Sequence, residues 1–374
     1  MGKNSIKSLL AAVFSFFIMA LPVVSFANEE GGEHAEKAEK PLFDANEVIF
    51  AHVLDAHEFH FLSYEGSDGA EHSIGFPLPV ILYSAERGFT SFLSSRFEHG
   101  HEAYNGYKIE GQKIGAVDGN GAVDESVKVY DISLTRNVVQ MLLALALLGF
   151  LLIKIASKYK TGVGTTKAPT GFQNAIEPVI TFIRDEVAKP NLGHKYEKYL
   201  PYLLTVFFFI LINNIFGLIP GTANVTGNIA FTAVLGVVSF IVITVSGNKH
   251  YWSHIINPPV PFGIKFIMVP VEILGIFTKP FALIIRLFAN MLAGHIIIIC
   301  LVSLIFIFGA LSKGIGWGFS PISISFAVFI YLIEVLVAFI QAFIFTNLTA
   351  VFIGQAIEDV HHQDGPGHDD AVII

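Results

Sequence analysis

Five apolar stretches in the second part of the chain are long enough to cross a lipid bilayer as helices. About 20 apolar residues span a hydrocarbon core of about 30 Å. We therefore expect transmembrane helices at residues 137–153, 200–219, 227–246, 281–311 and 321–353. The last two stretches are too long to stand upright in a bilayer, because each residue of a helix adds about 1.5 Å. They are predicted to be tilted and antiparallel, with a turn at 313–316.

The stretch before the fourth predicted helix is apolar but interrupted. Residues 262–278 contain Lys265, Pro270 and Glu272. This pattern predicts a segment that approaches along the membrane surface rather than a complete span.

The N-terminal third has a different pattern. Residues 1–27 combine a basic start, a short apolar run and a small-x-small site, which is typical of a signal peptide; a first transmembrane helix is the alternative. Residues 28–40 are polar and acidic, and a disordered segment is expected. Short aromatic and β-branched segments separated by Gly- and Asp-rich breaks then predict strands, at residues 59–64, 80–83 and 127–132.

The predicted fold is thus an all-α multi-pass membrane protein with a small β-rich or mixed extracytoplasmic module. The module occupies residues 28–135, and the membrane domain occupies 136–374. Charge supports this division: residues 28–135 hold 20 acidic and 7 basic side chains, whereas the chain from 136 onward holds 11 and 14. Among the connections between spans, the first and third hold eleven basic residues and the others only Lys313. The first and third connections are therefore expected in the cytoplasm, with the module outside and the C-terminus inside.

Composition removes several classes of function. Only 14% of the residues are charged, well below the share typical of soluble domains. The single cysteine, Cys300, allows neither an internal disulfide nor a thiolate metal cluster. No G-x-x-x-x-G-K-[ST] motif is present, so nucleotide binding is not expected. We expect no cofactor, no metal, no nucleic-acid partner and no catalytic site.

Ionisable residues inside the predicted spans are the main candidates for function, because such residues are costly at bilayer depth. Arg286, His295 and Glu334 lie within the last two spans. The amides of Asn290 and Gln341 accompany them. In an ideal antiparallel pair that turns near residue 314, Arg286 lies level with Gln341, and His295 with Glu334, about two turns nearer the outside.

This set of side chains suits proton passage. Arginine keeps its charge and cannot relay protons, but it can attract a carboxylate and block a leak. A histidine beside a carboxylate can exchange protons with water near neutral pH. Structural alternatives stay open: pairing for insertion at Arg286, packing or interhelical hydrogen bonds at His295, Gln341 and Asn290, and an ordinary interfacial acid at Glu272.

Three motifs closely resemble the signatures of the F-type ATP synthase subunit a family. They are KPFALIIRLFANMLAGH at 279–295, QAFIF at 341–345 and NNIFGLIP at 213–220, and the resemblance covers roughly residues 133–357. Three positions depart from the common pattern. Ala289 stands where glycine is common, and His295 and Glu334 exchange the places that many bacterial members give to an acid and a histidine.

The resemblance implies a role for each candidate residue. Arg286 would be the stator arginine that faces the carboxylate of a rotating c-ring, with Asn290 and Gln341 as its polar neighbours. His295 and Glu334 would line the outer half-channel, and Glu272 the inner one. The family also implies the c-ring and the b subunit of the peripheral stalk as partners, and a multi-pass place in a bacterial inner membrane with a periplasmic module.

Two functions from other classes remain as alternatives. One is a secondary transporter or channel whose intramembrane arginine binds an anion, although no repeats support it. The other is a membrane-tethered module that binds a metal or a partner through the His-rich segment 52–60. Copurification with ring and catalytic subunits would separate these from the first interpretation.

Overall fold

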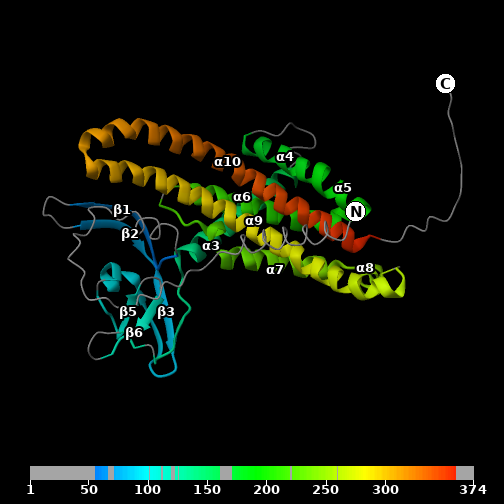
Figure 1. The fold of residues 1–374 in the computed structure, drawn as a ribbon, viewed down its shortest axis with the longest axis horizontal. Coiled ribbons are helices and arrows are strands. Elements are labelled where there is room, and N and C mark those ends of the chain that lie inside the picture. The colour runs from blue at the N-terminus through cyan, green and yellow to red at the C-terminus, as the bar shows by residue number, and fades with distance from the viewer. Residues whose placement is uncertain are drawn as a thin grey trace, which may run out of the picture. The chain divides into compact units, whose positions relative to one another are not determined.

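A computed structural model of the chain describes residues 55–65, 71–100, 102–110, 113–118, 123–124, 126–160, 171–219, 221–258 and 260–358. The predicted signal peptide at 1–27 and the polar segment at 28–40 lie outside these residues. A strand-containing part comes first along the chain, and a helical part follows (Figure 1).

The strands form three small antiparallel sheets. Their orders are β1-β2, β4-β3-β7 and β5-β6. The strands are β1 (Glu58–Glu65), β2 (Glu71–Pro77), β3 (Pro79–Ser84), β4 (Gly88–Leu93), β5 (Tyr107–Glu110), β6 (Lys113–Ala116) and β7 (Val129–Asp131). The three segments predicted as strands coincide with β1, β3 and β7.

Buried and less buried side chains alternate along β3, and the buried ones form the core of the strand-containing part. Val80 and Leu82 are fully buried, whereas Tyr83, the residue after Leu82, is 46% exposed. The short 3-10 helix η1 (Ser94–Gly100) contributes Phe97, and β5 contributes Tyr107 to the same apolar cluster. Side chains of a strand point alternately to its two faces, so a single β3 strand can anchor a cluster on one side.

Five of the helical segments are apolar and long enough to cross a membrane, in agreement with the number predicted. The principal helices are α3 (Arg136–Lys160), α4 (Phe172–Phe182), α5 (Lys189–Leu192), α6 (Tyr196–Leu218), α7 (Ile229–Ser246), α8 (Lys249–Ile256), α9 (Phe262–Leu311) and α10 (Lys313–Ile357). The short helices between them are η2 (Ile183–Ala188, a π-helix), η3 (Gly193–Lys195) and η4 (Val225–Gly227).

The last two helices extend further than the apolar pattern indicated. Residues 262–278 continue without a break into the predicted fourth span, so α9 has 50 residues and α10 has 45. Pro270 and Pro280 lie inside α9. Proline removes one backbone hydrogen bond, but neighbouring elements often compensate for this in long apolar helices.

The turn between α9 and α10 is tighter than expected. Ser312 is its one residue outside the two helices, whereas the predicted turn residues 313–316 already belong to α10. Close approach of the two backbones explains the glycines here: a Cβ on Gly316 would lie 2.7 Å from the Cα of Gly309. The turn therefore depends on the absence of a side chain at Gly316.

The first predicted cytoplasmic connection contains structure that the hydropathy pattern did not indicate. Residues 172–192 form α4, η2 and α5 in succession. Ile183 and Val187 are fully buried in the main helical core, and Ile176, Val179 and Ile180 pack against it. These apolar positions follow helical spacing, so periodicity rather than mean hydropathy was the signal for this element.

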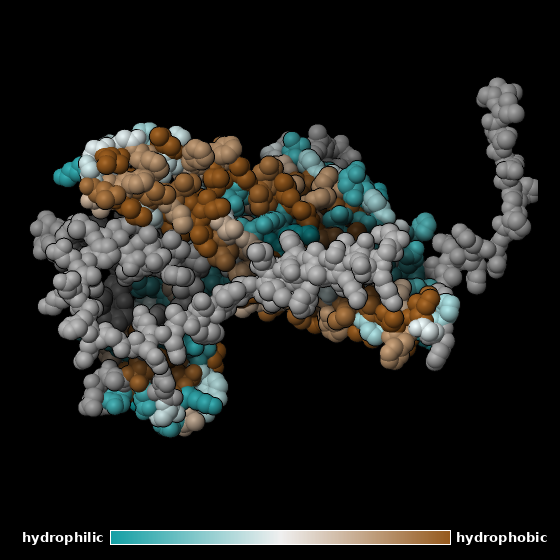
Figure 2. All heavy atoms as spheres, in the orientation of Figure 1, coloured by the Kyte–Doolittle hydropathy of each residue, from teal (hydrophilic) through white to brown (hydrophobic). Residues whose placement is uncertain are grey.

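The helical core gathers around α6 and the antiparallel pair α9–α10. Leu203, Phe207 and Ile210 of α6 are fully buried, and α6 packs against α10. Figure 1 shows α9 (yellow) and α10 (orange to red) side by side along much of their length. Apolar residues dominate the visible surface of this pair (Figure 2). Exposed apolar surface of this kind is typical of contact with lipid or with another apolar protein.

Candidate functional site

Helix α9 has one buried and one exposed face around Arg286. Leu283, Leu287 and Met291 are at most 2% exposed and form the buried stripe at helical spacing. Arg286 and Asn290 lie four residues apart on the exposed face. Within the described residues, no carboxylate lies within ion-pair distance of the Arg286 guanidinium. The structure thus presents this cation outward from the helical core.

Glu334 and Gln341 on α10 are both buried, with 7% and 4% of their surfaces exposed. The Glu334 carboxyl group lies directly against Gly294 of α9: a Cβ at Gly294 would be 2.1 Å from Glu334 Oε1. His295 is the next residue of α9, so the structure brings the predicted histidine and acid to neighbouring positions. Glu334 Oε2 is buried and accepts no hydrogen bond from the described part of the chain. A buried carboxylate oxygen in this condition is a natural place for water or a proton.

Gln341 lies on the side of α10 that packs against α6. Ala338 and Ala342 beside it are fully buried, and Asn214 Nδ2 donates a hydrogen bond of 3.1 Å to the Ala338 carbonyl. Among the described residues, no hydrogen bond or ion pair joins Gln341 to Arg286, and Gln341 is buried whereas Arg286 is exposed.

A polar clamp missed by the sequence analysis holds the loop at residues 219–228. Gln140 of α3 hydrogen-bonds both the N–H and the carbonyl of Ala223. Asn224 Nδ2 donates to the Met291 carbonyl at 3.2 Å, and Tyr331 Oη donates to the Leu218 carbonyl at 3.0 Å.

This clamp lies close to the His295–Glu334 pair, since Met291 is one turn before His295 and Tyr331 is one turn before Glu334. Its side chains fix the backbone at this end of the site. Polar residues inside otherwise apolar spans were the available signal, but their partners lie in distant parts of the sequence.

Glu272 lies at the other end of α9 and lines a cavity of about 450 Å³. It is half-buried, 14 residues before Arg286, which corresponds to about 21 Å along the helix. His295 lies about 14 Å beyond Arg286 in the opposite direction. The remaining polar lining residues come from α8, α9 and the end of α10: His250, Tyr251, His254, Lys279, Gln355 and Glu358.

The electrostatics of the cavity reflect this lining. Burial, together with the negative charge of Glu272, raises the pKa of Tyr251 above its ordinary value. Lys279 Nζ donates a hydrogen bond of 2.9 Å to Gln355 Oε1 and lies 5.1 Å from the centre of the Phe352 ring. Lys279 is thereby held at the junction of α9 and α10. Glu272 lines the same cavity.

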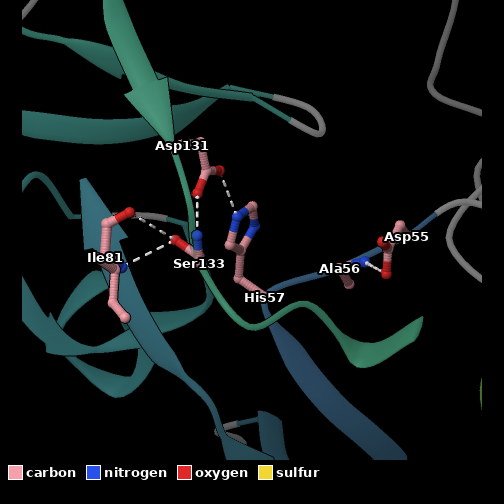
Figure 3. A network of polar contacts seen from close by, with 6 residues as sticks. All are labelled: Asp55, Ala56, His57, Ile81, Asp131 and Ser133. Atoms are coloured by element: carbon pink, nitrogen blue, oxygen red, sulfur yellow. Dashed lines mark hydrogen bonds and ion pairs between the residues drawn. The ribbon is translucent and has the colours of Figure 1, made fainter. Parts of the chain in front are cut away.

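The His-rich segment considered for metal binding is only partly within the described residues. Of its histidines, His52 and the side chain of His60 lie outside them. His57 is buried, and its Nε2 is 2.7 Å from Asp131 Oδ2 (Figure 3). In the described part of the chain, no three His, Cys, Asp or Glu side chains gather in a metal-binding group.

Comparison with known proteins covers both parts of the chain. Residues 138–354, more than half of the chain, match the family described as ATP synthase A chain. Residues 48–132 match a domain of unknown function (DUF8433).

Individual relatives have the same description. The "ATP synthase subunit a" of Chloroherpeton thalassium is 40% identical over 97% of this chain and 95% of its own length. "ATP synthase subunit a 2" of Prosthecochloris aestuarii is 48% identical over 64% of this chain and 73% of its own. "ATP synthase subunit a" of Myxococcus xanthus is 42% identical over 64% of this chain and 78% of its own. On the strength of the family match and the nearly full-length relative, this chain belongs to the ATP synthase A chain family.

Proposed function

We propose that the chain is the proton-conducting stator subunit of an F-type ATP synthase, with two laterally offset half-channels separated by Arg286. One observation carries the proposal: Arg286 and Asn290 occupy an uncovered face of α9, while titratable groups lie at separate places toward the two ends of that helix. A rotating ring of c subunits would cover that face. The proposal also includes the b subunit of the peripheral stalk as a partner, in keeping with the family.

The outer half-channel uses His295 and Glu334. The Glu334 carboxyl group lies beside Gly294, and one of its oxygens is buried without a hydrogen-bond partner among the described residues. A proton arriving from the periplasmic side passes these groups and neutralises a carboxylate on the ring. That ring subunit then moves into lipid, since a neutral acid costs far less there than a charged one.

The inner half-channel opens through the cavity at Glu272. After most of a turn, the ring carboxylate reaches this side and releases its proton toward the cytoplasm. The re-ionised carboxylate next passes Arg286, whose fixed positive charge favours the ionised form and prevents direct proton flow between the two paths. Each charge that crosses supplies roughly 2.3 kcal/mol per 100 mV of membrane potential. Gln341 supports the central region from the buried side of α10.

The topology of the proposal follows from the charges of the connections. The module at 28–135 is periplasmic, following a signal peptide at 1–27, and the C-terminus lies in the cytoplasm of a bacterial cell. The five apolar helices then lie in the inner membrane.

The test is the change Arg286→Ala in the assembled complex in inverted membrane vesicles. We expect ATP-driven proton pumping to fall below about 1% of the wild-type rate, because a catalytic electrostatic group of this kind contributes about 100-fold or more. Passive proton leak is expected to rise. Arg184→Ala is the matched control, since Arg184 pairs with the neighbouring Asp185 and lies outside both proposed paths. Coupled pumping at the wild-type rate in Arg286→Ala would refute the proposal.

A further inference from the structure

The cavity at Glu272 contains two histidines that the proposed half-channels do not use. His250 and His254 lie one turn apart on α8, with ring centres separated by 6.5 Å. Both side chains are exposed, and both line the cavity together with Glu272. They share one face of α8, because residues four apart in a helix lie on the same side.

Hydrogen bonds hold the start of α8 against the end of α10 at this position. The Asn248 N–H donates to the Ala356 carbonyl at 2.9 Å, and Asn248 Nδ2 donates to the Ile357 carbonyl at 2.9 Å. Ile255, which lines the same cavity, is buried. The two imidazoles are therefore held over the cavity by hydrogen bonds at the start of the helix and by apolar packing along it.

We propose that His250 and His254 relay protons between the cytoplasm and Glu272. The inference rests on the proposed function and adds two residues to its inner path. In the pumping direction, a ring nitrogen of one histidine takes a proton from water or buffer and becomes an imidazolium. That imidazolium then gives the proton toward the Glu272 carboxylate and returns to the neutral imidazole, so no other reactant is consumed.

The supply of protons gives a physical reason for such a relay. At pH 7 free protons are scarce, at about 10⁻⁷ M, so diffusional encounter with free protons limits how fast one site can be protonated. Histidines exchange protons with buffers near neutral pH, so a pair of them at the mouth of the cavity increases the supply.

The other charged and titratable groups at the cavity do not duplicate this function. Tyr251 of α8 has a raised pKa, Lys279 of α9 donates to Gln355, and Glu358 lies just after the end of α10. Together with Glu272, these are the groups that face the histidine pair from the three surrounding elements. The two acids attract an imidazolium and keep its proton near the path.

The experiment measures ATP-driven pumping in inverted vesicles, whose outer face is the cytoplasmic one. In weakly buffered medium near pH 8, the double variant His250→Gln/His254→Gln is expected to pump about tenfold more slowly than wild type, a modest part of the range typical of acid–base groups. Added imidazole, a mobile substitute for the lost side chains, should restore the rate. His194→Gln, an exposed histidine of η3 that does not line the cavity, should pump normally.

Two results would overturn the relay. One is wild-type pumping by the double variant in weak buffer. The other is a loss of pumping rate that added imidazole leaves unchanged, which would indicate a structural effect of the substitutions. The single variants His250→Gln and His254→Gln, each of which removes one exposed ring, test for such a structural effect a second time. Arg286→Ala in the same vesicles separates the two proposals: if it abolishes pumping while the double variant is normal, only the relay fails.

Discussion

Gly294 is the residue that allows the Glu334 carboxyl group to reach the backbone of α9. A Cβ there would lie 2.1–2.4 Å from all three atoms of the carboxyl group. No carbon and oxygen atoms can remain so close, so the carboxyl group would have to move away from His295. The position of the Glu334 carboxyl group therefore depends on the absence of one methyl group at Gly294.

Gly294→Ala is accordingly expected to lower the rate of proton pumping by about tenfold, because displacing a transfer group by about 1 Å commonly costs one to two orders of magnitude. Pumping in vesicles, normalised to the amount of assembled complex, measures this effect. Gly309→Ala is the matched control in the same helix, where a new Cβ meets no atom within 4 Å. Equal pumping by both variants would show that the Glu334 position is unimportant.

At the scale of elements, side-chain contacts join the segment before β1 to the segment between β7 and α3. His57 precedes β1, and Asp131 ends β7; their side chains meet at 2.7 Å (Figure 3). The Ser133 N–H donates to the same carboxylate at 2.9 Å, and Ser133 Oγ accepts from the Ile81 N–H at 3.0 Å. One residue network thus joins the start of β1, strand β3 and the segment that leads into α3.

This network predicts a pH-dependent stability of the strand-containing part. Burial alone would raise the pKa of Asp131, but hydrogen bonds from His57 and Ser133 outweigh it, and the net pKa is lowered below 3.8. A lowered pKa in the folded state means that the stabilisation is present above about pH 4 and is lost as the pH falls through the folded-state value. Asp131→Asn should therefore destabilise this part by about 1–2 kcal/mol near neutral pH.

Hydrogen exchange of the β7 and β1 amides in the assembled protein measures that loss. The difference between wild type and Asp131→Asn should shrink below pH 4, where the wild-type carboxylate also becomes protonated. Glu86→Gln, an exposed acid just after β3, serves as the control and should leave exchange unchanged. If the difference in exchange between wild type and Asp131→Asn were the same at low pH, the stabilisation would not come from the Asp131 carboxylate charge.

The elements show which parts of the fold the sequence can predict. Apolar runs of about 20 residues indicated the number of membrane-length helices correctly, because a helix needs about that length to cross a bilayer. The helix at 172–192 was missed because Glu177, Pro178 and Asp185 lower its mean hydropathy while its buried face keeps helical spacing. The continuity of α9 through Pro280 depends on packing with neighbouring helices, which no local pattern contains.

At the scale of the whole molecule, the uncovered surface is the informative feature. Large apolar side chains are exposed on α9 and α10, including Phe281 at 62%, Phe329 at 58% and Leu336 at 60%. Arg286 and Asn290 lie on this exposed, largely apolar surface. A charge in an apolar surface is costly against lipid, which supports the proposed contact of this face with a ring carboxylate.

The candidate site could be predicted only in part from the sequence, because some of its residues matter through contacts with distant parts of the chain. Arg286, His295 and Glu334 stand out because ionisable groups are rare in apolar runs. Gln140 and Asn224 do not stand out, because their importance comes from backbone partners at Ala223 and Met291 that lie far away in the sequence. The exposure of the Arg286 face is likewise a property of the packed helices and cannot be obtained from spacing alone.

Disulfide cross-linking to the c subunit is the most direct test of the central claim, that the Arg286 face of α9 meets the rotating ring. Cys300, the sole native cysteine, is first replaced by serine. A cysteine at Ala289, exposed between Arg286 and Asn290, is then paired with one placed beside the ring carboxylate. An oxidant-dependent cross-link is expected from Ala289→Cys and none from Leu287→Cys, because Leu287 is 1% exposed. Cross-linking from Leu287→Cys with none from Ala289→Cys would contradict the central claim.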